Sequence, residues 1–150
     1  MSFFRTFLST AIVVILTSFS YSQESNSDKL KKEGFEAYQK KDYLVSRNKF
    51  TDLIQHFKND TFLLGISYNM LGTIDRKEWD YSQAIYHFDQ ALSIYRAFKD
   101  DTLIAITLHN KGATYKTIAQ YDTAASFLIE ALSLFEKNNK LLRASQTLTL

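Results

Sequence analysis

One stretch of this sequence occurs twice and limits what the chain can fold into. Residues 72–93 and 112–133 align without a gap at an offset of 40. The positions that are identical in both copies are Gly72/Gly112, Tyr81/Tyr121, Ala84/Ala124, Ala91/Ala131, Leu92/Leu132 and Ser93/Ser133. A weaker copy around Gly34 lies 38 residues before the first of these. A period of this length is typical of stacked repeats, in which each unit covers the apolar face of its neighbour.

The spacing within each copy predicts a pair of helices. Apolar residues from Ala84 to Tyr95 recur at intervals of three, four and seven, which places them on one face of an α-helix. Gly72 lies in the helix before it, where glycine costs about 1 kcal/mol relative to alanine. A glycine that recurs there predicts a close crossing with a second helix. We call the glycine-bearing helix of each pair helix A and the alanine-bearing one helix B.

These residues resemble the tetratricopeptide repeat (TPR) family. The small residue, acidic-Tyr turn, alanine, aromatic residue and Ala-Leu pair of that family stand here as Gly72, Asp80-Tyr81, Ala84, Phe88 and Ala91-Leu92. The period of 38 to 40 exceeds the usual value of about 34, and proline is absent, so the chain resembles the longer variants. The resemblance implies an all-α, right-handed α-solenoid of antiparallel helix pairs, with three repeats and a partial fourth.

Recurring helix-capping residues divide the chain. We expect repeats at about 28–59, 60–99 and 100–139, with a partial one at 140–150. Asp42, Asp60, Asp80 and Asp100 stand where helices should begin, because a carboxylate there accepts backbone N–H groups. Residues 23–27 are expected to be a flexible leader. The last segment holds Leu141, Leu142 and Leu150, so we expect the native chain to continue or this end to pair with another chain.

The N-terminus predicts export. Arg5 precedes an apolar run from Phe7 to Phe19, and small residues Ser20 and Ser22 follow it. This order is typical of a secretory signal peptide, here residues 1–22. The alternative is an uncleaved signal anchor. The run is short for a membrane span, which needs about 20 residues, and no other segment could form one. We expect a periplasmic or secreted protein.

Several functional classes are disfavoured. The net charge of +2 offers no basic surface for nucleic acid. The chain has no cysteine, and its three histidines lack the spacing of a helical metal site. No phosphate loop or nucleophile motif occurs. The sequence therefore predicts neither catalysis nor a cofactor.

The resemblance places the partner site on the inner face of the A helices. The residues at the matching positions are Lys31, Phe35, Tyr38, Asn69, Thr73, Arg76, His109, Ala113 and Lys116. Some members of the family clamp the C-terminal carboxylate of heat-shock chaperones with two Lys, two Asn and an Arg. Those positions hold Lys31, Phe35, Met70, Ile106 and Asn110, so only the first matches. The clamp is not expected.

Two functions fit these observations. The first is an exported, non-catalytic scaffold that binds a peptide or protein partner in its concave groove. The second is the N-terminal input segment of a bacterial signal transducer, followed by a kinase or helix-turn-helix output. The sequence alone does not separate them.

Overall fold

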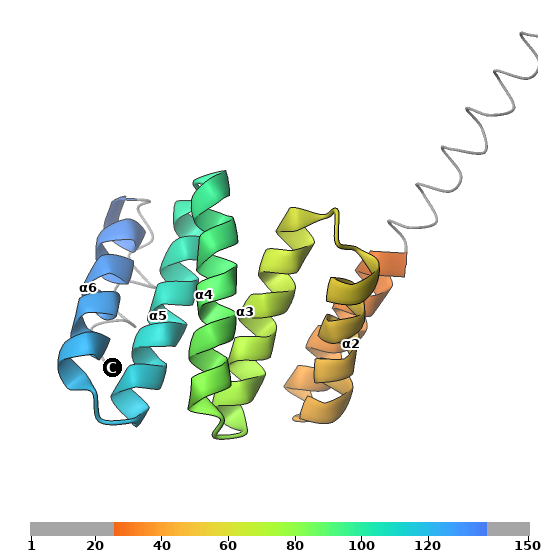
Figure 1. Cartoon of the computed structure of the whole chain (residues 1–150), viewed down its shortest axis with the longest axis horizontal. Coiled ribbons are helices and arrows are strands. Elements are labelled where there is room, and N and C mark those ends of the chain that lie inside the picture. Colours follow the sequence, from red (N-terminus) through yellow and green to blue (C-terminus); the bar gives the residue numbers. More distant parts are fainter. Residues whose placement is uncertain (1–25, 138–150) are drawn as a thin grey trace, which may run out of the picture.

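The computed structural model describes residues 26–137, which form six helices and no strand. Residues 26–39 form the first of these helices. The others are α2 (Tyr43–His56), α3 (Thr61–Lys77), α4 (Tyr81–Phe98), α5 (Asp101–Thr117) and α6 (Tyr121–Lys137). Antiparallel pairs stack side by side along the long axis of the molecule (Figure 1). The all-α solenoid is confirmed; the predicted signal peptide and partial fourth repeat lie outside the described residues.

The predicted helix starts agree with the structure because the capping aspartates act as expected. Asp42, Asp60 and Asp80 each accept a hydrogen bond from the backbone N–H three residues on, at 3.1, 2.9 and 3.1 Å. Asp100 caps α5 through the amides of Thr102 and Leu103. The first helix differs, since residues 26 and 27, which we assigned to a leader, are already helical.

Each A helix ends in the same turn. At Lys41, Trp79 and Ala119 the backbone takes a φ of 62°, 69° and 61°, in the left-handed region that favours glycine. In the middle turn the amide of Asp80 donates to the carbonyl of Asp75 at 2.9 Å, the bond that closes a Schellman motif. The turn residue after each A helix thus leads directly into the start of the B helix.

The recurring glycines mark helix crossings, as predicted. A Cβ built on Gly72 would lie 2.8 Å from the ring of Phe88 and 3.0 Å from the carbonyl oxygen of Ala84. One built on Gly112 would lie 2.9 Å from Leu128. Any side chain at these positions would force the helix pair apart.

Buried side chains form two clusters. The first core joins helix α2 to α3 and consists of Phe50, Leu53, Leu63, Met70, Leu71 and Ile74. The second core joins α4 to α5 and α6 and consists of Ala91, Leu92, Tyr95, Ile104, Ala105, Leu108, Ala131 and Phe135. Leu92 is buried, whereas Leu132, the matching residue one repeat later, is only partly buried. Within residues 26–137, no helix is long and apolar enough to cross a membrane.

Candidate partner-binding surface

The predicted site residues lie on the three A helices, and none is fully buried. We call them the A-helix stripe. The structure sets α3 next to α5, so the stripes of the second and third repeats adjoin. Helix 26–39 also brings its stripe close to α3. Burial raises the pKa of the Tyr38 hydroxyl, Tyr43 raises it further, and the nearby positive charge of Arg76 opposes the shift.

Some stripe residues already have partners within the chain. The ammonium group of Lys31 binds Asp28 at 2.7 Å. Phe35 is 37% exposed, but its ring packs edge-on against Phe50 of the first core at 5.3 Å. Thr73 donates its hydroxyl to the carbonyl of Asn69 at 2.9 Å. These three side chains therefore have structural roles that the sequence did not indicate.

Two stripe residues carry unsatisfied polar atoms. The side-chain oxygen Oδ1 of Asn69 and the nitrogen Nε of Arg76 are buried and find no hydrogen-bond partner among the described residues. Leaving a buried polar group unpaired costs about 1–3 kcal/mol. Both atoms belong to one face of α3, seven residues apart. This face thus holds two polar side chains with hydrogen-bonding capacity that the described residues leave unused.

The chaperone clamp does not form here. Met70, at one of its positions, is buried in the first core. Ile106, at another, packs against the second core. A side chain held in the core is not available to bind a carboxylate.

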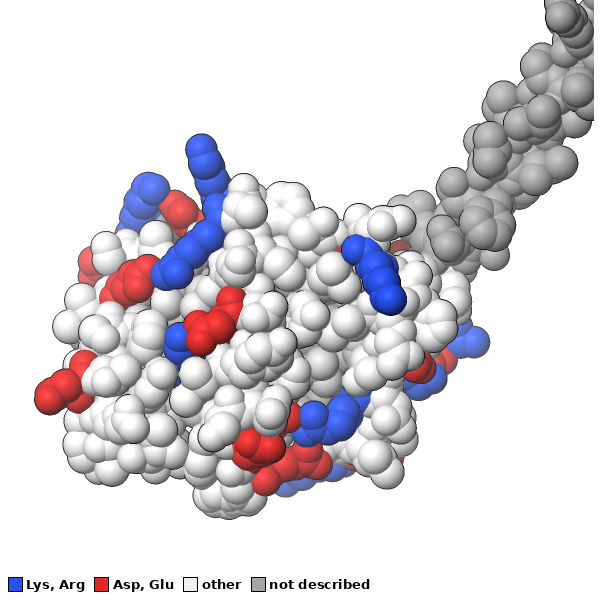
Figure 2. Space-filling view, in the orientation of Figure 1, with Lys and Arg blue, Asp and Glu red and all other residues white. Residues whose placement is uncertain are grey.

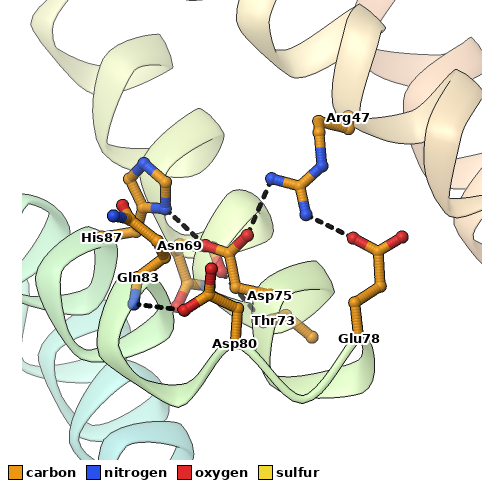
Figure 3. Close-up of polar contacts among 8 residues, drawn as sticks. All are labelled: Arg47, Asn69, Thr73, Asp75, Glu78, Asp80, Gln83 and His87. Carbon is orange, nitrogen blue, oxygen red and sulfur yellow. Dashed lines mark hydrogen bonds and ion pairs between the residues drawn. The ribbon is translucent and has the colours of Figure 1, made fainter.

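A buried carboxylate that the sequence analysis missed links three helices (Figure 3). Asp75 of α3 is 2% exposed. It binds Arg47 of α2 at 2.7 Å and the ring nitrogen Nδ1 of His87 of α4 at 2.6 Å. Arg47 also binds Glu78. Burial lowers the pKa of the Arg47 guanidinium, but its bonds to Glu78 and Asp75 outweigh that effect and raise it overall.

The position of Asp75 contains a signal for this network. It follows Ile74 and stands four residues after Leu71, so it falls on the buried face of α3. An acidic residue on such a face needs a partner, because burying an unpaired charge is highly unfavourable. The network explains His87 by its contact with Asp75 and its stacking on the ring of Tyr68. The network holds the three helices together, and we do not assign it a binding role.

Charged side chains of both signs alternate on the face drawn in Figure 2. Pairs such as Arg96 with Glu130 and Lys137 with Asp101 join neighbouring helices at the surface. No block of a single sign covers this face.

Comparisons with known proteins bear on the fold and the family. A sequence model described as "Tetratricopeptide repeat" matches residues 63–137, half of the 150 residues. No curated protein sequence matches the chain. Aspartyl phosphate phosphatase F from Bacillus subtilis matches with a TM-score of 0.79 and 24% identity, over 82% of this chain and 33% of that one. The chain therefore spans about a third of that protein.

Two further solved structures are matched over nearly their whole length. The N-terminal domain of stress-induced protein-1 from C. elegans has a TM-score of 0.63 and 17% identity, over 82% of this chain and 94% of that one. The TPR2B domain of yeast Sti1, solved in a complex with pHsp70, has a TM-score of 0.65 and 18% identity, over 81% and 91%. At these identities the likeness shows the fold alone.

Proposed function

This chain belongs to the tetratricopeptide repeat family, and we propose that it is a non-catalytic scaffold that binds a peptide or protein partner on its A-helix stripe. The fold and family support a protein-interaction role. The stripe is favoured over the rest of the surface because of one observation, the unpaired buried atoms of Asn69 and Arg76 on one face of α3. If these partly exposed side chains turn toward the surface, a bound segment can supply a donor for Asn69 and an acceptor for Arg76.

The free-energy cost of leaving these two atoms unpaired suggests a test. Replacing Asn69 with Leu and Arg76 with Met removes the unpaired groups and keeps much of their volume. The double variant should melt at or above the wild-type temperature, because groups that lack partners in the free protein are gone. It should nevertheless lose its partner. Such opposite effects on stability and binding are typical of binding surfaces.

Binding can be measured by affinity capture from the source cells, with quantitative mass spectrometry of wild type and variants in parallel. Gln83→Ala on the exposed face of α4 is the matched control and should capture the same proteins as wild type. If a protein captured by wild type is lost equally from the control and from the double variant, the stripe is not its binding site.

We further propose that the protein is exported, on the strength of the sequence of residues 1–22. Sequencing the N-terminus of the protein recovered from the source cells tests this. A mature chain that starts at Gln23 supports a cleaved signal peptide, and an intact N-terminus in the membrane fraction supports an uncleaved signal anchor.

The 38- to 40-residue period supports assignment to the longer repeat variants. Self-association through residues 140–150 stays a prediction, which light scattering would test.

A second candidate is an input segment of a signal transducer. It is supported by the likeness to aspartyl phosphate phosphatase F, in which the matched region is only 33% of the chain. Immunoblotting of source cells with an antibody against residues 26–137 distinguishes the two. A band much larger than 17.4 kDa favours the transducer, and a band near that mass favours the scaffold.

A further inference from the structure

A pocket of about 910 Å³ opens where the first repeat meets the second. Residues 55–62 form most of its wall, and Ser27 and Phe98 complete it. These residues are the first turn of helix 26–39, the end of α2, the α2–α3 connection, the first turn of α3 and the last residue of α4. The connection lies at the upper edge in Figure 1, at the opposite end of the helices from the turn that holds Trp79.

Two phenyl rings in this pocket are incompletely covered. Phe62 is 47% exposed and Phe98 is 51% exposed. Their rings meet edge-on with 6.4 Å between centroids, so the pair is a fixed apolar surface. Large rings on a concave surface are the usual anchor points for ligands, since a guest group removes both from water at once.

The charges around the rings favour an uncharged guest. Lys58 and Asp60 carry opposite charges on the same wall, and the His56 ring beside them has its nitrogen Nδ1 on the carbonyl of Asp52 at 2.9 Å. The carboxylate of Asp60 already accepts the amide of Leu63 at 2.9 Å, and it would repel an anion. Gln55, Asn59 and Thr61 add only neutral polar groups, which suit the amides of a peptide backbone.

The pocket is a property of this junction rather than of the repeat. On α5 the position that matches Phe62 holds Thr102, so the next repeat lacks the ring. Phe62 also stands seven residues before Asn69 on α3, about two helical turns, or roughly 10 Å. A segment bound to the A-helix stripe could therefore reach the pocket within a few residues.

We propose that this pocket binds a bulky uncharged side chain, Phe, Leu or Trp, from the partner segment. The proposal extends the proposed function by naming the residue that anchors the partner at the upper end of α3. That connection rests on the proposed function. The preference of the pocket for an apolar side chain does not, and it can be tested without a partner.

The probe is N-acetyl-L-phenylalaninamide, titrated into isotope-labelled full-length chain and followed by NMR. N-acetylglycinamide is the control for the backbone amides, and the α-amide of N-acetyl-L-aspartic acid, which keeps its side-chain carboxylate, is the control for charge. We expect saturable shifts at the amides of 57–62 and at the rings of Phe62 and Phe98 with the first probe alone. The double variant Phe62→Ala, Phe98→Ala should bind at least roughly tenfold more weakly.

Matched variants separate the two proposals. Tyr86→Ala removes a ring of similar exposure outside the pocket and should leave binding unchanged. Asn69→Leu with Arg76→Met should also leave it unchanged, even if partner capture is lost. Equal shifts with the glycine probe, no saturable shift at 57–62, or full binding by the double phenylalanine variant would overturn the pocket proposal. None of these results would affect the proposed function of the stripe.

Discussion

At the junction between the first and second repeats, the carboxylate of Asp75 ties α2, α3 and α4 together through Arg47 and His87. At the next junction, the apolar residues of the second core, from Leu92 to Phe135, meet between α4, α5 and α6. Lys111 lies there too and is 7% exposed; its ammonium lies 4.6 Å from the centre of the Phe127 ring and binds Asp89, which is half exposed. At the first junction a buried carboxylate thus joins three helices, whereas at the second most of the contact is apolar packing and the ion pair of Lys111 is open to water on its Asp89 side.

The two junctions contribute differently to the orientation of the repeats and to the stability of the fold. A buried ion pair adds little net free energy, because desolvation offsets most of the attraction, yet losing one partner is costly. Such a network tolerates only one arrangement of its helices. Apolar packing gives more free energy and less directional constraint. We infer that the first junction fixes the angle between repeats, and that the second supplies more of the stability.

The largest expected effects come from truncating the two cores. Leu53→Ala and Leu108→Ala each remove a fully buried side chain and should destabilise by about 2–5 kcal/mol. Since neighbours in a repeat array interact only pairwise, the losses should be local. Hydrogen exchange should increase in helix 26–39 and α2 for the first variant, and in α4 to α6 for the second. If both variants instead lost hydrogen-exchange protection evenly over all six helices of residues 26–137, the two junctions would not be separate units.

The buried charges should respond unequally. Asp75→Asn leaves Arg47 and His87 without their carboxylate and should cost about 3 kcal/mol, the low end for a broken buried pair because Arg47 is partly exposed. Lys111→Met removes the buried ammonium and leaves only the half-exposed Asp89 without its partner, so it should change stability by less than about 1 kcal/mol. Urea unfolding measures both, with Glu130→Gln, which breaks the exposed pair with Arg96, as the control. Equal costs at Asp75 and Lys111 would remove the distinction drawn between the junctions.

The glycine crossings should also differ between the repeats. At Gly72 a Cβ would meet the backbone oxygen of Ala84 at 3.0 Å, which cannot move without the helix, so Gly72→Ala should cost about 1–3 kcal/mol. At Gly34 the nearest atoms belong to the ring of Phe50 and the Lys49 side chain. There the gain in helix propensity, about 1 kcal/mol, should offset a small ring movement. Thermal melts of both variants test this, and a larger loss at Gly34 would contradict it.

The smallest effect is expected at alkaline pH. Burial raises the pKa of the Tyr95 hydroxyl, in the second core, and the charge of Asp100 raises it further. Above the unfolded pKa of about 10, the unfolded chain loses this proton and the folded chain keeps it, so stability falls as pH rises. Tyr95→Phe should lessen the fall between pH 10 and 11, by less than about 1.4 kcal/mol. The exposed Tyr121→Phe is the control; an equal effect there would rule out burial as the cause.

The sequence predicts the parts of this structure that recur. The starts of α2 to α5 follow from an aspartate that precedes each of these helices, and the crossings follow from Gly72 and Gly112, because one physical requirement produces one residue in each copy. Alignment of the repeats hides whatever occurs once. Asp75 is matched by Tyr115, so its pairing with Arg47 has no counterpart to reveal it.

The candidate sites divide in the same way. The register of the A helices locates the stripe, but the partners of Lys31 and Phe35 within the chain depend on side-chain positions that no spacing contains. The pocket requires Phe62 and Phe98 to meet across an antiparallel pair, and only the folded chain brings these residues together.

The left-handed turns at Lys41, Trp79 and Ala119 have a practical consequence. Their shared backbone geometry is held by hydrogen bonds from neighbouring residues, so the side chain at each turn is free to vary, and Trp79 is 76% exposed. The chain has no cysteine of its own. Cysteines introduced at any two of these positions would therefore carry a pair of spectroscopic labels at equivalent points of the repeats. The distance between the two labels would report the curvature of the array in solution.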